Sequence, residues 1–140
     1  MGLILNASTI NAGSGGSAGG AGSIEAVMAT VDVPAFVDAD GPKITIPSTL
    51  NGTNLVRVSA RTIVAGTTNA TTIQVRRTRG VTTVDMLSTV ASIASGTTGP
   101  AVGVIDAAND DVLTDDLLTI TVPSLSTTAP KGLVVVIEFG

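Results

Sequence analysis

The chain has 140 residues, enough for one domain with a sizeable hydrophobic core. Its net charge of −4 argues against a protein that binds nucleic acid mainly through a basic surface. It contains no cysteine and no histidine, which excludes disulfides, thiol nucleophiles and metal sites built from those two residues.

Residues 1–22 are predicted to form an extended N-terminal arm. Residues 3–10 favour a short strand, and residues 11–22 contain almost only Gly, Ser and Ala, which is typical of a flexible tether. Two arrangements are open: the strand is donated to the sheet of a neighbouring subunit, or it packs on its own domain. Fully extended, the arm would span at most about 70 Å. Its candidate contact residues are the apolar side chains Leu3, Ile4, Leu5 and Ile10.

The folded domain is predicted to span residues 23–140. Residues 23–33 alternate as a strand does, although a helix over residues 23–29 is an alternative. Residues 43–47 form a short strand bracketed by prolines, which favours the edge of a sheet. The pair Asn51-Gly52 is a turn signal.

Residues 55–64 give the clearest strand, with a period of two. The side chains predicted to face the core are Val56, Val58, Ala60, Thr62 and Val64. Arg57 and Arg61 are predicted to face outwards, on either side of Ser59, and are candidate contact residues. The next predicted strand covers residues 71–77. Its alternation predicts that Ile73 and Val75 face inwards and that Gln74 and Arg76 face outwards.

Further short strands follow, separated by turn signals. Their predicted ranges are 81–86, 87–93, 101–105, 117–122 and 132–139. About eight or nine strands at a spacing of roughly 8–12 residues are typical of an all-β sandwich or barrel. The apolar run in residues 132–139 favours a central strand, covered on one side by the core and on the other by a neighbour. We therefore predict an all-β, jelly-roll-like antiparallel sandwich.

Three arginines are predicted at the end of one hairpin: Arg76, Arg77 and Arg79. They are either a polar hairpin end or a subunit contact, in which guanidinium groups meet carboxylates of a neighbour. The Asp-rich segment 106–116 is the natural partner, with Asp110 and Asp111 as candidate contact residues. That segment is read as a turn capped by Asp side chains, a subunit salt bridge or a calcium site. Because its spacing does not match an EF-hand loop, no metal ligand is assigned.

The sequence predicts no enzyme, no cofactor and no membrane partner. A Ser or Thr nucleophile would need a lysine as its base, and the two lysines, Lys43 and Lys131, each lie beside a proline in a loop-like stretch. The segment Gly13-Ser14-Gly15-Gly16 lies in the arm rather than between a strand and a helix, so it is not a phosphate loop. No stretch is apolar enough to form a transmembrane helix.

Turn-and-strand motifs recur between Arg57 and Phe139. They are TIVAGTT at 62–68, TIQV at 72–75, DMLST at 85–89, VIDAANDDV at 104–112, DLLTI at 116–120 and STTAPKGL at 126–133. On these motifs the segment resembles a β-sandwich module found in structural proteins of tailed bacteriophages. Such modules have jelly-roll-type sandwiches, are usually trimeric and occur on capsid surfaces and fibres. The family pattern supplies no catalytic residues.

The resemblance implies a virion protein that is assembled in the host cytoplasm and contacts itself, as a homotrimer, and the major capsid protein. The expected function is capsid decoration, with the arm clamping neighbouring capsomers. A fibre or tail module that recognises the host surface is the alternative, although the chain has only two aromatic residues to stack on glycans. A third hypothesis is a monomeric bacterial or engineered binding module whose arm is a dispensable linker.

Overall fold

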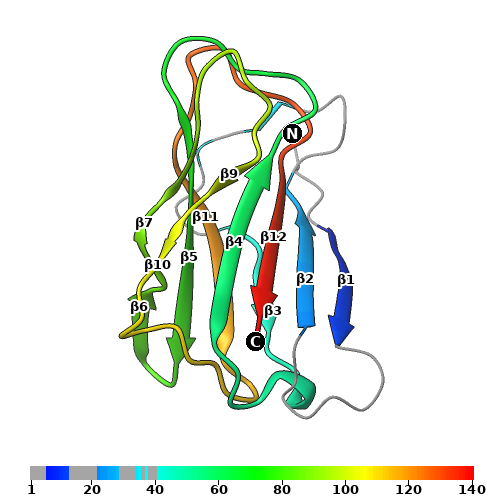
Figure 1. The fold of residues 1–140 in the computed structure, drawn as a ribbon, viewed down its shortest axis with the longest axis vertical. Helices are drawn as coiled ribbons and strands as arrows, with labels where there is room; N and C mark the ends of the chain where they lie inside the picture. Colours follow the sequence, from blue (N-terminus) through cyan, green and yellow to red (C-terminus); the bar gives the residue numbers. More distant parts are fainter. Residues whose placement is uncertain (1–5, 13–21, 29–33, 36, 38–40) are drawn as a thin grey trace.

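The computed structural model describes residues 6–12, 22–28, 34, 35, 37 and 41–140. The described chain is an antiparallel β-sandwich, as predicted, with two sheets on either side of one core (Figure 1). The strands are β1 (Asn6–Ala12), β2 (Gly22–Val27), β3 (Lys43–Thr45), β4 (Leu55–Arg61), β5 (Thr71–Arg79), β6 (Thr82–Asp85), β7 (Leu87–Thr89), β8 (Ala91–Ile93), β9 (Ala101–Val102), β10 (Val104–Ile105), β11 (Leu117–Ser124) and β12 (Val134–Phe139). A 3-10 turn, η1 (Ser48–Leu50), precedes β4. No helix in the described part is long and apolar enough to cross a membrane.

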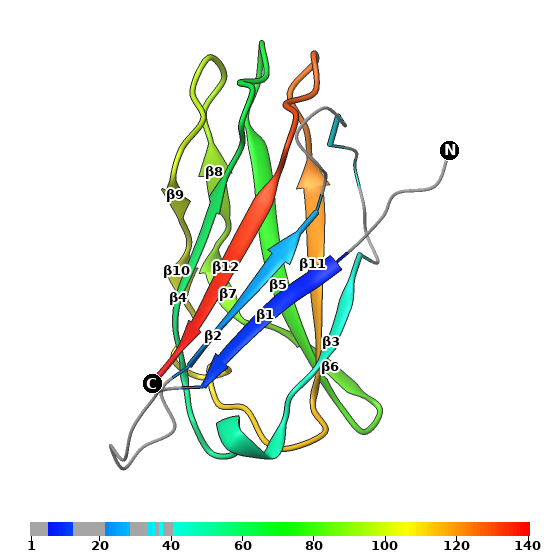
Figure 2. The same cartoon turned by 90° about the vertical axis from the view of Figure 1, so that its right-hand side faces the viewer.

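The first sheet has the strand order β1-β2-β12-β4-β9 and faces the viewer in Figure 2. The C-terminal strand β12 is central, as its apolar run predicts, and it pairs with β2 on one side and β4 on the other. Its alternate side chains Val135, Ile137 and Phe139 are buried in the core. Val134 and Val136 on the opposite face are only half-buried, so in this chain the core covers one face of β12.

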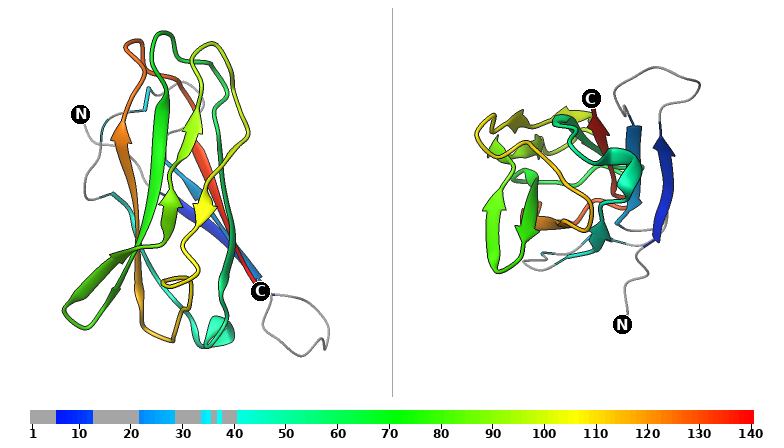
Figure 3. Two further views of the ribbon diagram at one scale, coloured as in Figure 1. Left: turned by 60° about the vertical axis from the view of Figure 1, so that its left-hand side comes forward. Right: turned by 90° about the horizontal axis from the view of Figure 1, so that it is seen from below.

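The second sheet has the order β3-β11-β5-β6, and β8 also pairs with β5. The edge position predicted for residues 43–47 is confirmed, because β3 pairs only with β11 among the described strands. One edge of β5 pairs with β6 along one part of its length and with β8 along another. Between these two strands the chain leaves the sheet as β7, which pairs with β10. Figure 3 shows the β5–β6 hairpin (green) extending away from the body, with Val81 fully exposed at its tip.

The N-terminal strand lies in the first sheet of its own chain. Residues 6–12 form β1, which pairs antiparallel with β2, and the register places Ile10 opposite Ile24. Of the two open arrangements, packing on its own domain is therefore the one seen for this segment. Leu3, Ile4 and Leu5 lie outside the described residues, as do residues 13–21.

The inward face predicted for residues 55–64 is correct in the middle and wrong at both ends. Val58, Ala60 and Thr62 are buried, but Val56 and Val64 are about half exposed. The register with β12 shifts between Arg57 and Leu55, which leaves Val56 as the extra residue of a β-bulge. The bulge turns Leu55 into the core in place of Val56. Val64 lies beyond the strand in a loop, where its backbone pairs with Lys131.

Gln74 is the other departure from the predicted faces. It belongs to the outward series of β5, but its side chain is buried rather than exposed. The amide nitrogen donates to the carbonyl of Leu87 at 3.1 Å, and its oxygen accepts the N–H of Leu87 at 3.1 Å. The side chain thus replaces the backbone pairing that is missing where β7 leaves the sheet.

Candidate functional site

An arginine–aspartate cluster joins the end of β5 to the loop of residues 106–116. Alternation along β5 places Arg77 on the same side as Ile73 and Val75, so its guanidinium lies largely buried at the margin of the core. Arg77 donates from Nη1 to both the carbonyl oxygen and the carboxylate of Asp111. Its buried Nε has no hydrogen-bond partner among the described residues.

Arg79 completes the cluster with a two-pronged contact to Asp116. Its Nε donates to Oδ1 at 2.9 Å and its Nη2 to Oδ2 at 2.6 Å, which is the bidentate geometry of a strong guanidinium–carboxylate pair. Its Nη1 lies 3.0 Å from Oδ2 of Asp111. Asp116 is almost fully buried, and it also accepts the backbone N–H of Leu113 at 2.8 Å. The loop is therefore held against β5 through two carboxylates.

The ionisation of both carboxylates follows from these contacts. Burial raises the pKa of Asp116, but hydrogen bonds from Arg79 and Leu113 outweigh it, so the net pKa is lowered. Burial also raises the pKa of Asp111, but the hydrogen bonds from Arg77 and Arg79 outweigh it, so the net pKa is lowered. The hydrogen bond to Asp116 raises the pKa of Arg79. All three groups are charged at neutral pH.

The rest of the Asp-rich segment forms a turn. Asp106 accepts hydrogen bonds from the side chain of Asn109 at 2.8 Å and the backbone N–H of Ala108 at 3.1 Å, which lower its pKa. The backbone carbonyl of Asp110 accepts from Leu55 at the start of β4. Within the described residues, no group of three or more acidic side chains is placed to hold a metal ion.

The predicted contact residues thus fall into separate groups. Arg77 and Arg79 meet Asp111 within one chain, so the pairing of arginines with this loop is intramolecular here. Arg76, on the opposite face of β5, pairs with Asp85 of β6 at 2.9 Å. Arg57 pairs with Glu138 across the first sheet at 3.1 Å, and Arg61 is exposed. Whether any of these residues contacts another subunit stays a prediction.

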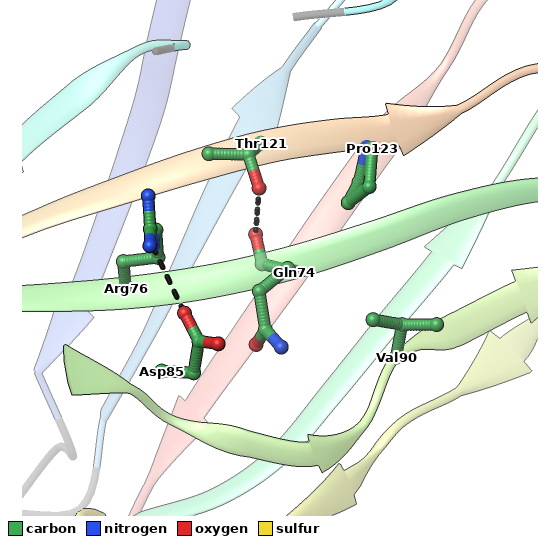
Figure 4. Close-up of a pocket in the computed structure, with 6 residues that line it drawn as sticks. All are labelled: Gln74, Arg76, Asp85, Val90, Thr121 and Pro123. Atoms are coloured by element: carbon green, nitrogen blue, oxygen red, sulfur yellow. Dashed lines mark hydrogen bonds and ion pairs between the residues drawn. The ribbon is translucent and has the colours of Figure 1, made fainter. Parts of the chain in front are cut away.

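A depression of about 470 Å³ lies on the outer face of the second sheet, beside the point where β7 leaves it. Figure 4 shows the Arg76–Asp85 pair at one end and Val90 with Pro123 at the other. Gln74 and Thr121 form its floor. The sequence did not predict this depression, because its lining comes from residues far apart in the chain, from Gln74 to Pro123.

The outer face of the first sheet combines apolar and charged side chains. Val134, Val136 and Glu138 of β12 are half-buried along its middle. Val102 on β9 is 50% exposed. Arg57 and Arg61 project from β4, and Glu25 projects from β2. This arrangement of fixed charges around an apolar centre suits binding to another surface rather than proton transfer.

Comparisons of the chain with protein-family models, with curated proteins and with solved structures give no match.

Proposed function

We propose that this chain is a non-enzymatic structural protein of a tailed-phage virion, namely a capsid decoration protein. The observation that supports it most is the outer face of the first sheet, where Val134 and Val136 remain half-exposed on the central strand. Their partial exposure leaves apolar area available for contact with other subunits. In this role the chain forms homotrimers that contact one another and the major capsid protein.

The internal pairing of the cluster around Arg77 and Arg79 fits the same proposal. Its charges are neutralised within the chain, so the loop end of the sandwich is fixed without a partner. The N-terminal segment, including the apolar residues 3–5, supplies a further contact with the shell. Many weakly held copies on one particle would gain strength through avidity.

The test is the number of copies of this chain relative to the major capsid protein in purified particles, measured by quantitative mass spectrometry. Hundreds of copies support decoration of the shell. Absence from particles contradicts any virion role. A variant that lacks residues 1–5, and so keeps β1, should be released from the particle more readily, whereas unchanged retention contradicts the contact of this segment with the shell.

The alternative, a fibre or tail module that binds the host surface, is favoured by the depression in Figure 4. Its volume is that of a small-ligand site, and its lining combines the Arg76–Asp85 pair with two apolar side chains. A few to tens of copies per particle would support this alternative over decoration. Loss of host-cell binding in an Arg76→Ala variant would support it further.

A further inference from the structure

The outer face of the first sheet has opposite charges on the two sides of its central strand. The register places Val136 of β12 level with Ser59 of β4 on one side and Glu25 of β2 on the other. Arg57 and Arg61 lie two residues before and after Ser59, which is about 6.6 Å along the strand in each direction. One side of the apolar centre is therefore basic, and the other side is acidic.

We propose that two copies of this chain pair face to face through the first sheet, about a two-fold axis that runs along β12. Such a rotation exchanges the two sides of the face, so β4 of one copy lies over β2 of the other. Glu25 of each copy then lies between Arg57 and Arg61 of its partner. On the axis Val136 meets Val136, and Glu138, which is paired with Arg57 of its own chain, meets Glu138. Both charge contacts occur twice because the interface is isologous.

The charge pattern also selects this axis over the other one possible for face-to-face packing. A two-fold axis across the strands would place β4 over β4 and bring the two pairs of arginines together. Like charges facing one another cost several kcal/mol. Sheets that pack face to face also prefer strands aligned within about 30°, which an axis along β12 provides.

The size of the face sets the expected strength. Four strands about 20 Å long and the short β9, all about 4.8 Å apart, give a footprint on the order of 400 Å² per copy. This lies at the low end for specific interfaces, so we expect weak association that is detected only at high protein concentration. The pairing does not depend on the proposed virion role. If the chain is also trimeric through other surfaces, the two contacts together give a hexamer with dihedral symmetry.

A charge exchange tests the proposal without relying on loss of function alone. Arg61→Glu places two acidic strands against each other, and Glu25→Arg places two basic strands against each other. We expect each variant alone to self-associate about tenfold or more weakly than the unmodified chain. A mixture of the two variants restores both opposite-charge contacts, so it should form a heterodimer. Arg61 is chosen because Arg57 already pairs with Glu138 within the chain.

Sedimentation velocity up to several hundred micromolar and native mass spectrometry of the mixture give the readouts. A dimer or hexamer of the unmodified chain, together with selective 1:1 pairing of the two variants, supports the proposal. A monomer or a trimer alone overturns it. Dimers that neither charge reversal weakens overturn it as well, because another surface must then make the contact.

A matched pair of valine substitutions provides the control. Val136→Ser should weaken the pairing about tenfold, since it removes the apolar contact on the axis. Val81→Ser removes the same side chain from the exposed tip of the β5–β6 hairpin and should leave association unchanged. Circular dichroism of both variants checks the fold. Equal effects of the two substitutions contradict the assignment of this face.

Discussion

Thr62 is a residue whose side chain conflicts with its surroundings. Only 1% of its surface is exposed, and its hydroxyl has no hydrogen-bond partner among the described residues. A buried hydroxyl without a partner loses its hydrogen bonds to water and gains none in return. Valine has nearly the same shape but carries no hydroxyl.

We therefore predict that Thr62→Val raises the free energy of unfolding by about 1 kcal/mol. Denaturant unfolding at neutral pH measures it. Thr62→Ser is the matched control, because it keeps the hydroxyl, removes a methyl group and should lower stability. A loss of stability in the valine variant would mean that the hydroxyl has a partner after all.

At the scale of elements, the chain crosses out of the second sheet at Leu87 and returns to it at Ala91. The chain leaves β6, pairs briefly with β10 as β7, and returns to β5 as β8. Gln74 closes the gap that this excursion leaves in the second sheet, through its two hydrogen bonds to Leu87. Gln74→Leu keeps most of the side-chain volume but removes both hydrogen bonds.

We expect Gln74→Leu to lower the free energy of unfolding by about 2 kcal/mol, since the N–H and the carbonyl of Leu87 lose these partners. Thermal and denaturant unfolding give the value. Hydrogen exchange at Leu87 should accelerate more than exchange at Ile120 in the middle of β11. Uniform acceleration at both amides would show that the side chain supports the whole fold rather than the crossover.

How well the sequence predicts an element depends on how far apart in the chain the interacting residues lie. Local alternation was enough to place Val58 and Ala60 inwards, and the apolar run in residues 132–139 was enough to put β12 at the centre of a sheet. It was wrong at Val56 because a bulge depends on the partner strand, which a local pattern does not contain. The burial of Gln74 was missed for the same reason, since its partner Leu87 lies 13 residues away. The pairing of the arginines with the Asp-rich segment was predicted, but between subunits, because the sequence does not show that Arg77 and Asp111, 34 residues apart, meet within one chain.

For the whole molecule, the cluster at the loop end links stability to pH. The folded-state pKa values of Asp111 and Asp116 are lowered, so these carboxylates stabilise the fold above their unfolded pKa of about 3.9. That stabilisation is lost as the pH falls below about 4 and through the lower folded-state pKa values. The protein should therefore unfold more easily in acid than at neutral pH.

Asp116→Asn should lower stability at pH 7 by about 2 kcal/mol, less than for a fully buried pair because Arg79 is 37% exposed. The difference from the unmodified protein should narrow as the pH falls below about 4, where Asp116 becomes protonated. Melting temperatures from pH 7 to pH 3 measure both effects. Asp85→Asn, in the exposed pair with Arg76, is the control and should change stability by less than about 0.5 kcal/mol. A difference that stays constant with pH would contradict the assigned role of Asp116.

The central position of β12 also affects how the protein is made. A ribosome completes β2 and β4 long before residues 134–139, yet those two strands meet only through β12. Until that strand emerges, the first layer consists of two parts with unpaired edges, and Ile24 and Val58 lack their neighbour Ile137. This half of the sandwich therefore folds only after residues 134–139 have emerged, and the nascent chain is most exposed to aggregation in the interval before β12 is available.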